Sequence, residues 1–215
     1  TVLLVLFLFF ENKKNRIHIG TIIIIAFIIR LSGIMISRNI NNYNLQSYDL
    51  IGNLILKGVN IYPEQARLHF PYFPFFLYIE AITSYLGTFL LNQATLLKLV
   101  FIFFDVGIII VLHKISTKSN YALLYAVNPI SPLVSSIHGQ FDSIPLFFFF
   151  IKLLLHIHKH KNVAGLLLAS IAILVKPWPA LFMVPLLLKV KGRLLPIIFI
   201  FPLLSVIVYK NLFHS

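Results

Sequence analysis

Long uninterrupted apolar runs constrain this chain more than any other feature. Four of them are long enough, or nearly so, to cross about 30 Å of hydrocarbon as tilted helices: Ile17–Ser37, Phe73–Leu91, Leu96–Leu112 and Leu194–Tyr209. Phenylalanine and isoleucine come in solid blocks, without the alternation typical of a membrane β-barrel. Since 59% of the 215 residues are hydrophobic and only 11% are charged, we predict an all-α polytopic transmembrane helix bundle that forms one domain over residues 1–215.

The net charge of +12 would suggest a nucleic-acid partner in a soluble protein. Here the lysines and arginines lie in short loops, where they orient membrane spans and meet anionic headgroups. We therefore predict a multi-pass integral membrane protein, in the plasma membrane if the source is prokaryotic, with lipid and not nucleic acid as its surroundings. Three basic turns are placed inside: Glu11–Arg16, His156–Lys161 and Lys189–Arg193.

The chain begins within an apolar run, Thr1–Phe10, and ends shortly after another. The first run has no basic leader and no small-residue cleavage site, so it resembles a clipped transmembrane helix more than a signal peptide. We expect the sequence to be part of a longer membrane protein.

Proline and glycine positions predict where the helices break. In the polar segment Arg38–Pro71, placed outside, Tyr48–Leu56 is predicted as a short surface helix that ends at Gly58. The spans Phe73–Leu91 and Leu96–Leu112 are predicted to form a helical hairpin. Broken or half-length helices are expected in two segments: Tyr121–Ile137, which contains Pro129 and Pro132, and Val163–Leu188, which is interrupted at Lys176–Pro179.

These assignments conflict at one point. The basic turns place residues 138–142 outside, on the same side as Asp49, whereas three full spans between the two would place them inside. One of the three must be re-entrant or incomplete, and the proline-broken Tyr121–Ile137 is the segment we expect to be so.

Only six acidic residues are available for chemistry: Glu11, Asp49, Glu64, Glu80, Asp105 and Asp142. Asp49 has two interpretations. It could cap the surface helix by accepting backbone N–H bonds, or it could act as a general base at the membrane–water boundary and activate an acceptor hydroxyl.

Asp105 lies within an apolar span and needs a partner. Lys98 is two turns earlier on the same face, and Arg30 of the first full span is the other partner that the sequence offers. A structural pair is the favoured interpretation for Asp105. Glu80 could pair with Lys57 or Arg67, or face a cavity.

The segment His138-Gly139-Gln140-Phe141-Asp142 places a histidine, an amide and a carboxylate between two apolar runs. Such groups are costly in hydrocarbon, at about 2.5–3.5 kcal/mol for an ionisable residue at a helix centre. Asp142 or Ser143 could simply begin the next helix as its cap, but that leaves His138 and Gln140 unexplained. We expect the segment to bind a sugar or phosphate. Lys176 either extends to a headgroup or neutralises a lipid-linked phosphate.

Metal and nucleotide sites are not indicated. His156, His158 and His160 are interleaved with lysines and look like a basic turn, and there is no Asp-x-Asp pair, H-E-x-x-H, Walker A loop or G-x-S-x-G. We predict no metal site and no cofactor, with a divalent cation left open.

Several motifs nevertheless resemble those of the integral-membrane glycosyltransferases of the GT-C class. They are Asn128-Pro129, Ser135-Ser136-Ile137-His138-Gly139-Gln140-Phe141-Asp142-Ser143, Ala164-Gly165-Leu166 and Lys176-Pro177-Trp178-Pro179. The similarity extends from about Ile17 to Leu188 and includes Arg30, Asp49, Gly58, Asn60, Tyr62, Tyr72, Lys98 and Asp105. The nearest groups are prokaryotic polyprenyl-phosphate-sugar transferases, which are similar to dolichol-pathway glucosyltransferases and, more remotely, to GPI-anchor mannosyltransferases.

This resemblance implies inverting transfer of a hexose, mannose or glucose, from a polyprenyl-phosphate donor to a hydroxyl of a glycan, lipid or protein acceptor. It implies Asp49 as the base, with His138, Gln140, Asp142, Lys176, Arg30, Tyr62 and Tyr72 binding substrate. Phe73 and Phe75 depart from the YPP-like residues expected there. We expect the patches near residues 49, 140 and 176 to share one pocket. A transporter or lipid flippase and a non-catalytic assembly subunit are the alternatives.

Overall fold

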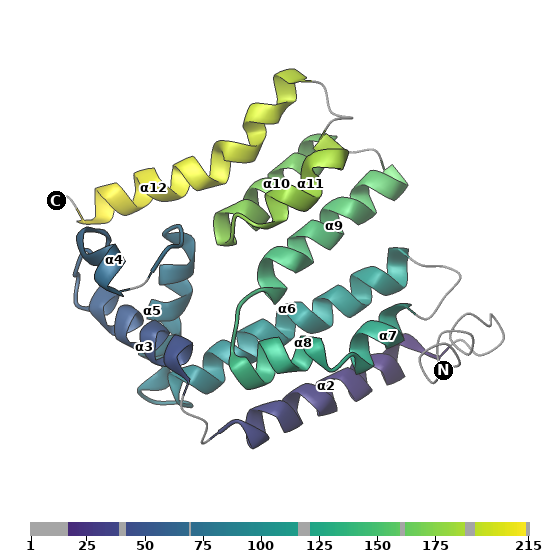
Figure 1. Ribbon diagram of the computed structural model, residues 1–215, viewed down its shortest axis with the longest axis horizontal. Helices are drawn as coiled ribbons and strands as arrows, with labels where there is room; N and C mark the ends of the chain where they lie inside the picture. Colours follow the sequence, from purple (N-terminus) through teal and green to yellow (C-terminus); the bar gives the residue numbers. More distant parts are fainter. Residues whose placement is uncertain are drawn as a thin grey trace.

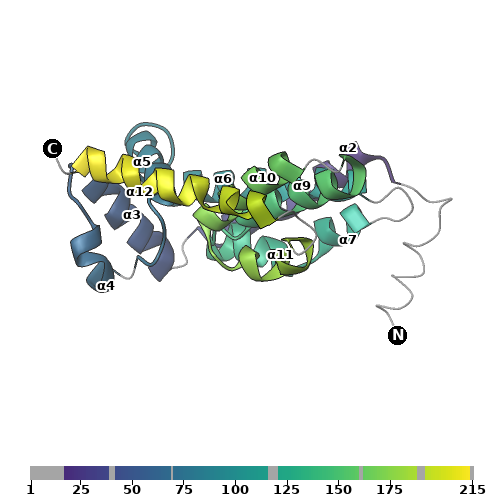
Figure 2. The same ribbon diagram turned by 90° about the horizontal axis from the view of Figure 1, so that it is seen from above.

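The computed structural model describes residues 17–38, 42–68, 70–115, 121–159, 162–187 and 192–213. Within these ranges the chain is helical and contains no strand, so the prediction of an all-α bundle is confirmed. The helices lie in a flat, elongated arrangement, with α3 and α4 at one end and the start of α2 at the other (Figures 1 and 2). The apolar run Thr1–Phe10 and the basic turn Glu11–Arg16 lie outside the described residues.

Three of the described helices are long and apolar enough to cross a membrane. They are α2 (Ile19–Ile36), α6 (Gln93–Ile115) and the continuous segment Gly192–Phe213, formed by η4 (Gly192–Phe199) and α12 (Ile200–Phe213). Each coincides with a span predicted from the sequence. Shorter apolar helices lie between them: α5 (Phe75–Gly87), α9 (Ser143–Lys159) and α10 (Asn162–Val175).

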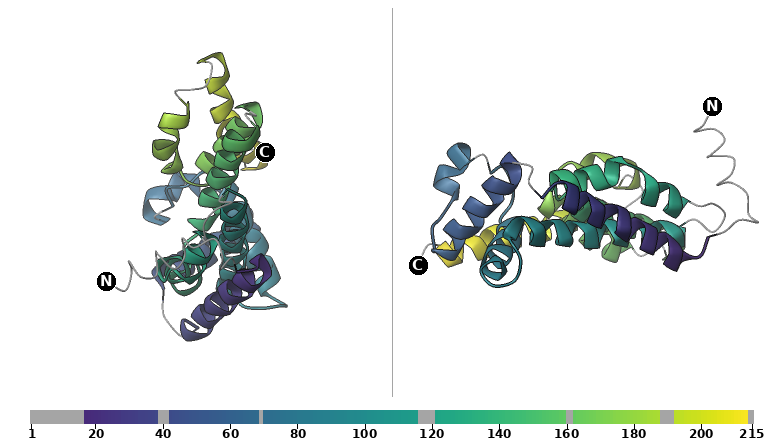
Figure 3. Two further views of the ribbon diagram at one scale, coloured as in Figure 1. Left: turned by 90° about the vertical axis from the view of Figure 1, so that its right-hand side faces the viewer. Right: turned by 90° about the horizontal axis from the view of Figure 1, so that it is seen from below.

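The proline-broken segment lies along α2 and α6 (Figure 3). It consists of α7 (Tyr121–Val127), α8 (Ile130–Pro132) and the π-helical turn η3 (Leu133–His138). At one end of α2, Ile22 and Ala26 pack in one cluster with Ile109 of α6 and Ala126 of α7. At the other end, the Ser37 hydroxyl donates to the Ser136 carbonyl oxygen over 3.2 Å. The broken segment therefore lies along α2, but it is divided into three short pieces, as predicted, and is not one of the three long apolar helices.

Helix α5 is also shorter than the three long apolar helices, because it has only 13 residues. It packs across the surface helix α3 (Tyr43–Leu56). Gly52 makes this close approach possible, since a Cβ there would lie 2.2 Å from Ser84 Oγ and 2.6 Å from the Glu80 carbonyl oxygen. The predicted hairpin of two full spans is thus corrected: its first member belongs with α3, η2 (Tyr62–Glu64) and α4 (Gln65–Leu68) in a cap at one end. Asp49 and His138 lie on the same side of the bundle, since the start of α3 contacts His138 and Gly139.

The second half of the chain adds helices beside α6. Helix α9 runs parallel to α6: Ser143 Oγ donates to the Phe101 carbonyl oxygen over 2.9 Å, and Phe147 lies against Gly107 one turn further on. Helix α10 returns along α9 and ends at Val175, and α11 (Pro179–Leu187) follows the break. The break predicted at Lys176–Pro179 is therefore present.

An aromatic cluster joins the cap to the long helices. Phe76 of α5 stacks on Phe141 with ring centroids 3.7 Å apart, and Tyr48 of α3 meets both rings edge-on. Phe101 of α6 completes the group. Because Phe141 is the centre of this cluster, the 138–142 segment is held against α3, α5 and α6 at once.

Candidate functional site

The segment 138–142 begins where the π-helical turn ends. Gly139 adopts φ 73°, a left-handed conformation that favours glycine, and the Gln140 N–H donates to the Val134 carbonyl oxygen over 2.9 Å. Short π turns are frequent at functional sites because they redirect side chains within a helix. Here the turn places Gln140 and Asp142 against the residue that follows α10.

Lys176 and Asp142 form an ion pair at this point. Lys176 Nζ lies 2.8 Å from Asp142 Oδ1 and 3.4 Å from Gln140 Oε1, and Trp178 Nε1 donates to the same carboxylate over 3.1 Å. The ammonium also lies 4.2 Å from the centroid of the Phe141 ring. Two predicted patches, at 140 and 176, are thus brought together, and Lys176 is 8% exposed instead of extending to a headgroup.

Arg30 and Asp105 form a second, fully buried ion pair, which is the interhelical alternative that the sequence offered. Arg30 Nε donates to Asp105 Oδ2 over 2.5 Å, and its other nitrogens donate to the Ala26 and Ala126 carbonyl oxygens and to Ser131 Oγ. Asp105 also accepts hydroxyl bonds from Tyr125, Ser131 and Ser135. The network ties α2, α6 and the broken segment together.

The acidic members of the two ion pairs border one small cavity of about 260 Å³. Its wall includes both acids, Asp105 and Asp142, together with Asn128, Ser131 and Trp178. Carboxylate, amide and indole groups of this kind suit a sugar ring, which offers both hydroxyls and an apolar face.

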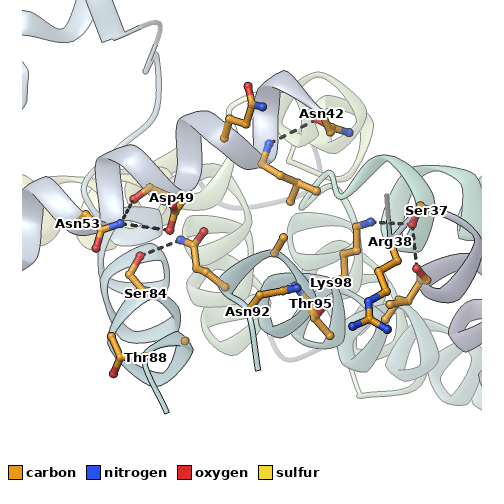
Figure 4. A pocket seen from close by; sticks show the side chains of 16 residues that line it. Ser37, Arg38, Asn42, Asp49, Asn53, Ser84, Thr88, Asn92, Thr95 and Lys98 are labelled. Carbon is orange, nitrogen blue, oxygen red and sulfur yellow. Dashed lines mark hydrogen bonds between the residues drawn. The ribbon is translucent and has the colours of Figure 1, made fainter. Parts of the chain in front are cut away.

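Asp49 faces a different and larger cavity of about 470 Å³, within the roughly 300–1,000 Å³ typical of small-molecule sites. The cavity is polar and lies between α3, the start of α6 and the end of α2 (Figure 4). Asp49 is exposed there; its Oδ1 accepts from Asn53 Nδ2 over 3.2 Å, and no described cation lies within ion-pair distance.

Asp49 is not the cap of its helix. Helix α3 begins at Tyr43, earlier than predicted, and the Asn42 side chain accepts the Asn44 N–H over 2.9 Å. Asp49 therefore lies in the middle of the helix, and the capping interpretation is wrong. Asp142, by contrast, directly precedes α9, and its carbonyl oxygen accepts the Leu146 N–H over 3.2 Å, so the helix begins where the sequence predicts. The Asp142 side chain also binds Lys176, and the Ser143 hydroxyl donates to the Phe101 carbonyl oxygen.

The expectation of one shared pocket is not met, because Asp49 borders the larger cavity, whereas Asp142, the partner of Lys176, borders the smaller one. They nevertheless lie at the same end of the molecule. Leu45 packs on Gly139, and Asn42 Nδ2 donates to the His138 carbonyl oxygen over 2.5 Å. His138 is exposed beside the start of α3, with its Nδ1 3.5 Å from Asn44 Nδ2.

Tyr62 and Tyr72 border a third cavity of about 450 Å³ with Asn60, Tyr209 and Lys210. The Tyr62 hydroxyl donates to the Tyr72 carbonyl oxygen over 2.8 Å. Burial first, and the Asp142 carboxylate second, raise the pKa of the Tyr72 phenol above its ordinary value.

Neither Lys98 nor Glu80 has the partner that the sequence suggests. Lys98 does not bind Asp105 but donates to Ser37 Oγ over 2.7 Å. Glu80 is buried, and neither of its carboxylate oxygens has a hydrogen-bond partner among the described residues. Arg67, one of its suggested partners, pairs with Glu64 over 2.7 Å.

Sequence reasoning missed two residues of this region. The sequence marks Trp178 only as part of a motif, and the structure shows that it binds Asp142. The sequence places Arg38 at the start of the polar segment, and the structure shows that it borders the Asp49 cavity. The sequence offers one signal for Arg38, which directly follows Ser37, a small polar residue at the end of a predicted span. In the structure, Ser37 accepts a hydrogen bond from Lys98 of another helix.

No family model, curated protein or solved structure matches the chain. Function is therefore inferred from the residues and their geometry.

Proposed function

We propose that this chain is a multi-pass integral membrane glycosyltransferase that transfers a hexose from a polyprenyl-phosphate donor to an acceptor hydroxyl. The observation that carries the proposal is Asp49: an exposed carboxylate, free of described cations, in a polar cavity of about 470 Å³ at one end of an apolar helix bundle. The end with Asp49, Gln140 and Lys176 is the outer one if the basic turns are inside.

The reaction is a single displacement with inversion. The acceptor oxygen attacks the anomeric carbon and forms the new C–O bond while the bond between that carbon and the phosphate oxygen breaks. The electron pair of the broken bond leaves with the phosphate, and the acceptor proton passes to the Asp49 carboxylate. General-base assistance of this kind contributes about 100–10,000-fold.

The neighbouring groups support this chemistry in different ways. Asn53 donates to Asp49 Oδ1 and to the Asp49 carbonyl oxygen, which holds the carboxylate in place on α3. Asp142, with Lys176 and Trp178 bound to it, offers a partner for sugar hydroxyls in the adjoining small cavity. A lipid donor enters through the membrane, so no nucleotide-binding domain is required.

The test is sugar transfer in membranes with Asp49→Asn, which keeps the size of the side chain but removes the base. We expect transfer from a radiolabelled polyprenyl-phosphate hexose to fall about 100–10,000-fold. Glu64→Gln is the matched control, since Glu64 is an exposed acid of the same cap whose partner is Arg67. Retained transfer by Asp49→Asn would remove Asp49 as the base, and transport of the lipid without transfer would favour a transporter.

A further inference from the structure

Lys98 is a buried cation without an acidic partner among the described residues. Its side chain is on α6, the residue is 4% exposed, and its ammonium donates to Ser37 Oγ over 2.7 Å. The described ion pairs join Arg30 to Asp105, Arg67 to Glu64 and Lys176 to Asp142, so none includes Lys98. A buried charge is strongly unfavourable unless an opposite charge compensates it, so an anion bound beside Lys98 would stabilise the charged form of its ammonium.

A second cation borders the same cavity. Arg38 follows Ser37 directly in the chain, is exposed and has no ion pair with a described residue. Figure 4 shows Arg38 and Lys98 together on one side of the cavity and Asp49 on the other. The cavity wall thus contains two basic residues and one acidic residue, and both basic residues lie opposite the Asp49 carboxylate.

Lys176, the residue expected from the sequence to bind the lipid phosphate, is already compensated. Its ammonium is paired with Asp142 over 2.8 Å and lies against the Phe141 ring. Arg30 is compensated by Asp105 and is fully buried. Among the predicted cations of this end, Lys98 is the one left without an opposite charge.

We propose that Lys98 and Arg38 bind the phosphate monoester of the polyprenyl leaving group, in the cavity that also contains Asp49. This assignment rests on the proposed function and specifies its phosphate subsite. A guanidinium and an ammonium complement a phosphate that gains negative charge as the sugar–phosphate bond breaks. Placing that phosphate opposite Asp49 positions the base and the leaving group on the two faces of the sugar, as inversion requires.

The test is binding of sugar-free polyprenyl phosphate to the full chain in phosphatidylcholine nanodiscs. We expect Lys98→Met and Arg38→Gln each to weaken binding by about 10-fold or more, the effect of losing one charge-assisted hydrogen bond. Lys57→Met is the matched control, because Lys57 is an exposed lysine at the end of α3. This variant should bind polyprenyl phosphate as the unmodified chain does. The two test variants lie on different elements, and methionine at 98 adds no polar group to the helix.

Competition identifies the source of the phosphate. Inorganic phosphate and phosphatidylglycerol should both displace polyprenyl phosphate poorly. Equal affinity for inorganic phosphate would overturn the lipid assignment, and full affinity in both Lys98→Met and Arg38→Gln would overturn the site itself. Asp49→Asn should bind polyprenyl phosphate normally while failing to transfer sugar, so failure of the base and failure of the phosphate site give different results.

Discussion

Removing Asp105 should destabilise the bundle more than any other single charge deletion in its interior. The Arg30 and Asp105 side chains are 0% and 2% exposed, so Asp105→Leu would leave a guanidinium buried without an opposite charge. It would also remove the acceptor for the Tyr125, Ser131 and Ser135 hydroxyls. Deleting one partner of a buried ion pair costs about 3–5 kcal/mol, and we expect Asp105→Leu to lie in that range.

Companion variants separate the charge from the hydrogen bonds. Arg30→Met leaves Asp105 with its three hydroxyl donors and should cost less than Asp105→Leu. Asp105→Asn keeps an acceptor oxygen and should be intermediate. The double variant, Arg30→Met with Asp105→Leu, should be more stable than the sum of the two single changes by about 0.5–3 kcal/mol.

The assay is unfolding by sodium dodecyl sulfate in mixed micelles. Trp178 is the single tryptophan of the chain and is bonded to Asp142, so its fluorescence reports on the packing of this end. A loss below about 1 kcal/mol for Asp105→Leu, the level of a surface ion pair, would refute the reasoning. So would strict additivity in the double variant.

Two glycine substitutions test how α3 is held. Gly139→Ala forces a side chain into a left-handed conformation, at about 1–2 kcal/mol, and brings its Cβ to 2.8 Å from Leu45; unfolding free energy should fall accordingly, and an unchanged value would contradict the turn geometry. Gly52→Ala places a Cβ 2.2 Å from Ser84 Oγ, so α3 should shift off α5 and sugar transfer should fall, whereas Gly192→Ala, in open space, should have no effect on transfer. Full transfer by Gly52→Ala would show that the α3 position does not matter.

Hydropathy predicted the long helices because length and apolarity are local properties of the sequence. Helix α2 begins and ends within two residues of its predicted span, and α6 extends its predicted span by three residues at each end. Hydropathy failed for α5, since a short apolar helix buried against α3 has the same composition as part of a span. Only part of the apolar content of Phe73–Leu91 packs in the cap: Phe76 and Leu77 are fully buried, whereas Ile82, Phe89 and Leu90 are exposed.

The partners of the buried charges could not be predicted in the same way. The sequence offers two partners for Asp105, Lys98 on the same helix and Arg30 on another, and the structure has Arg30, 75 positions away. Such a choice depends on how three helices pack, and residue spacing within one helix carries no information about it. The motif segments at 138–142 and 176–179 were more informative: both lie at one end of the molecule, and their charged residues bind each other.

The central claim is that Asp49 and the pair Lys98 and Arg38 act on one substrate from opposite sides of one cavity. The most direct measurement compares sugar transfer with polyprenyl phosphate binding in the same nanodisc preparation of Asp49→Asn. We expect polyprenyl phosphate binding to be unchanged while sugar transfer falls about 100–10,000-fold. Transfer at the rate of the unmodified chain would contradict it.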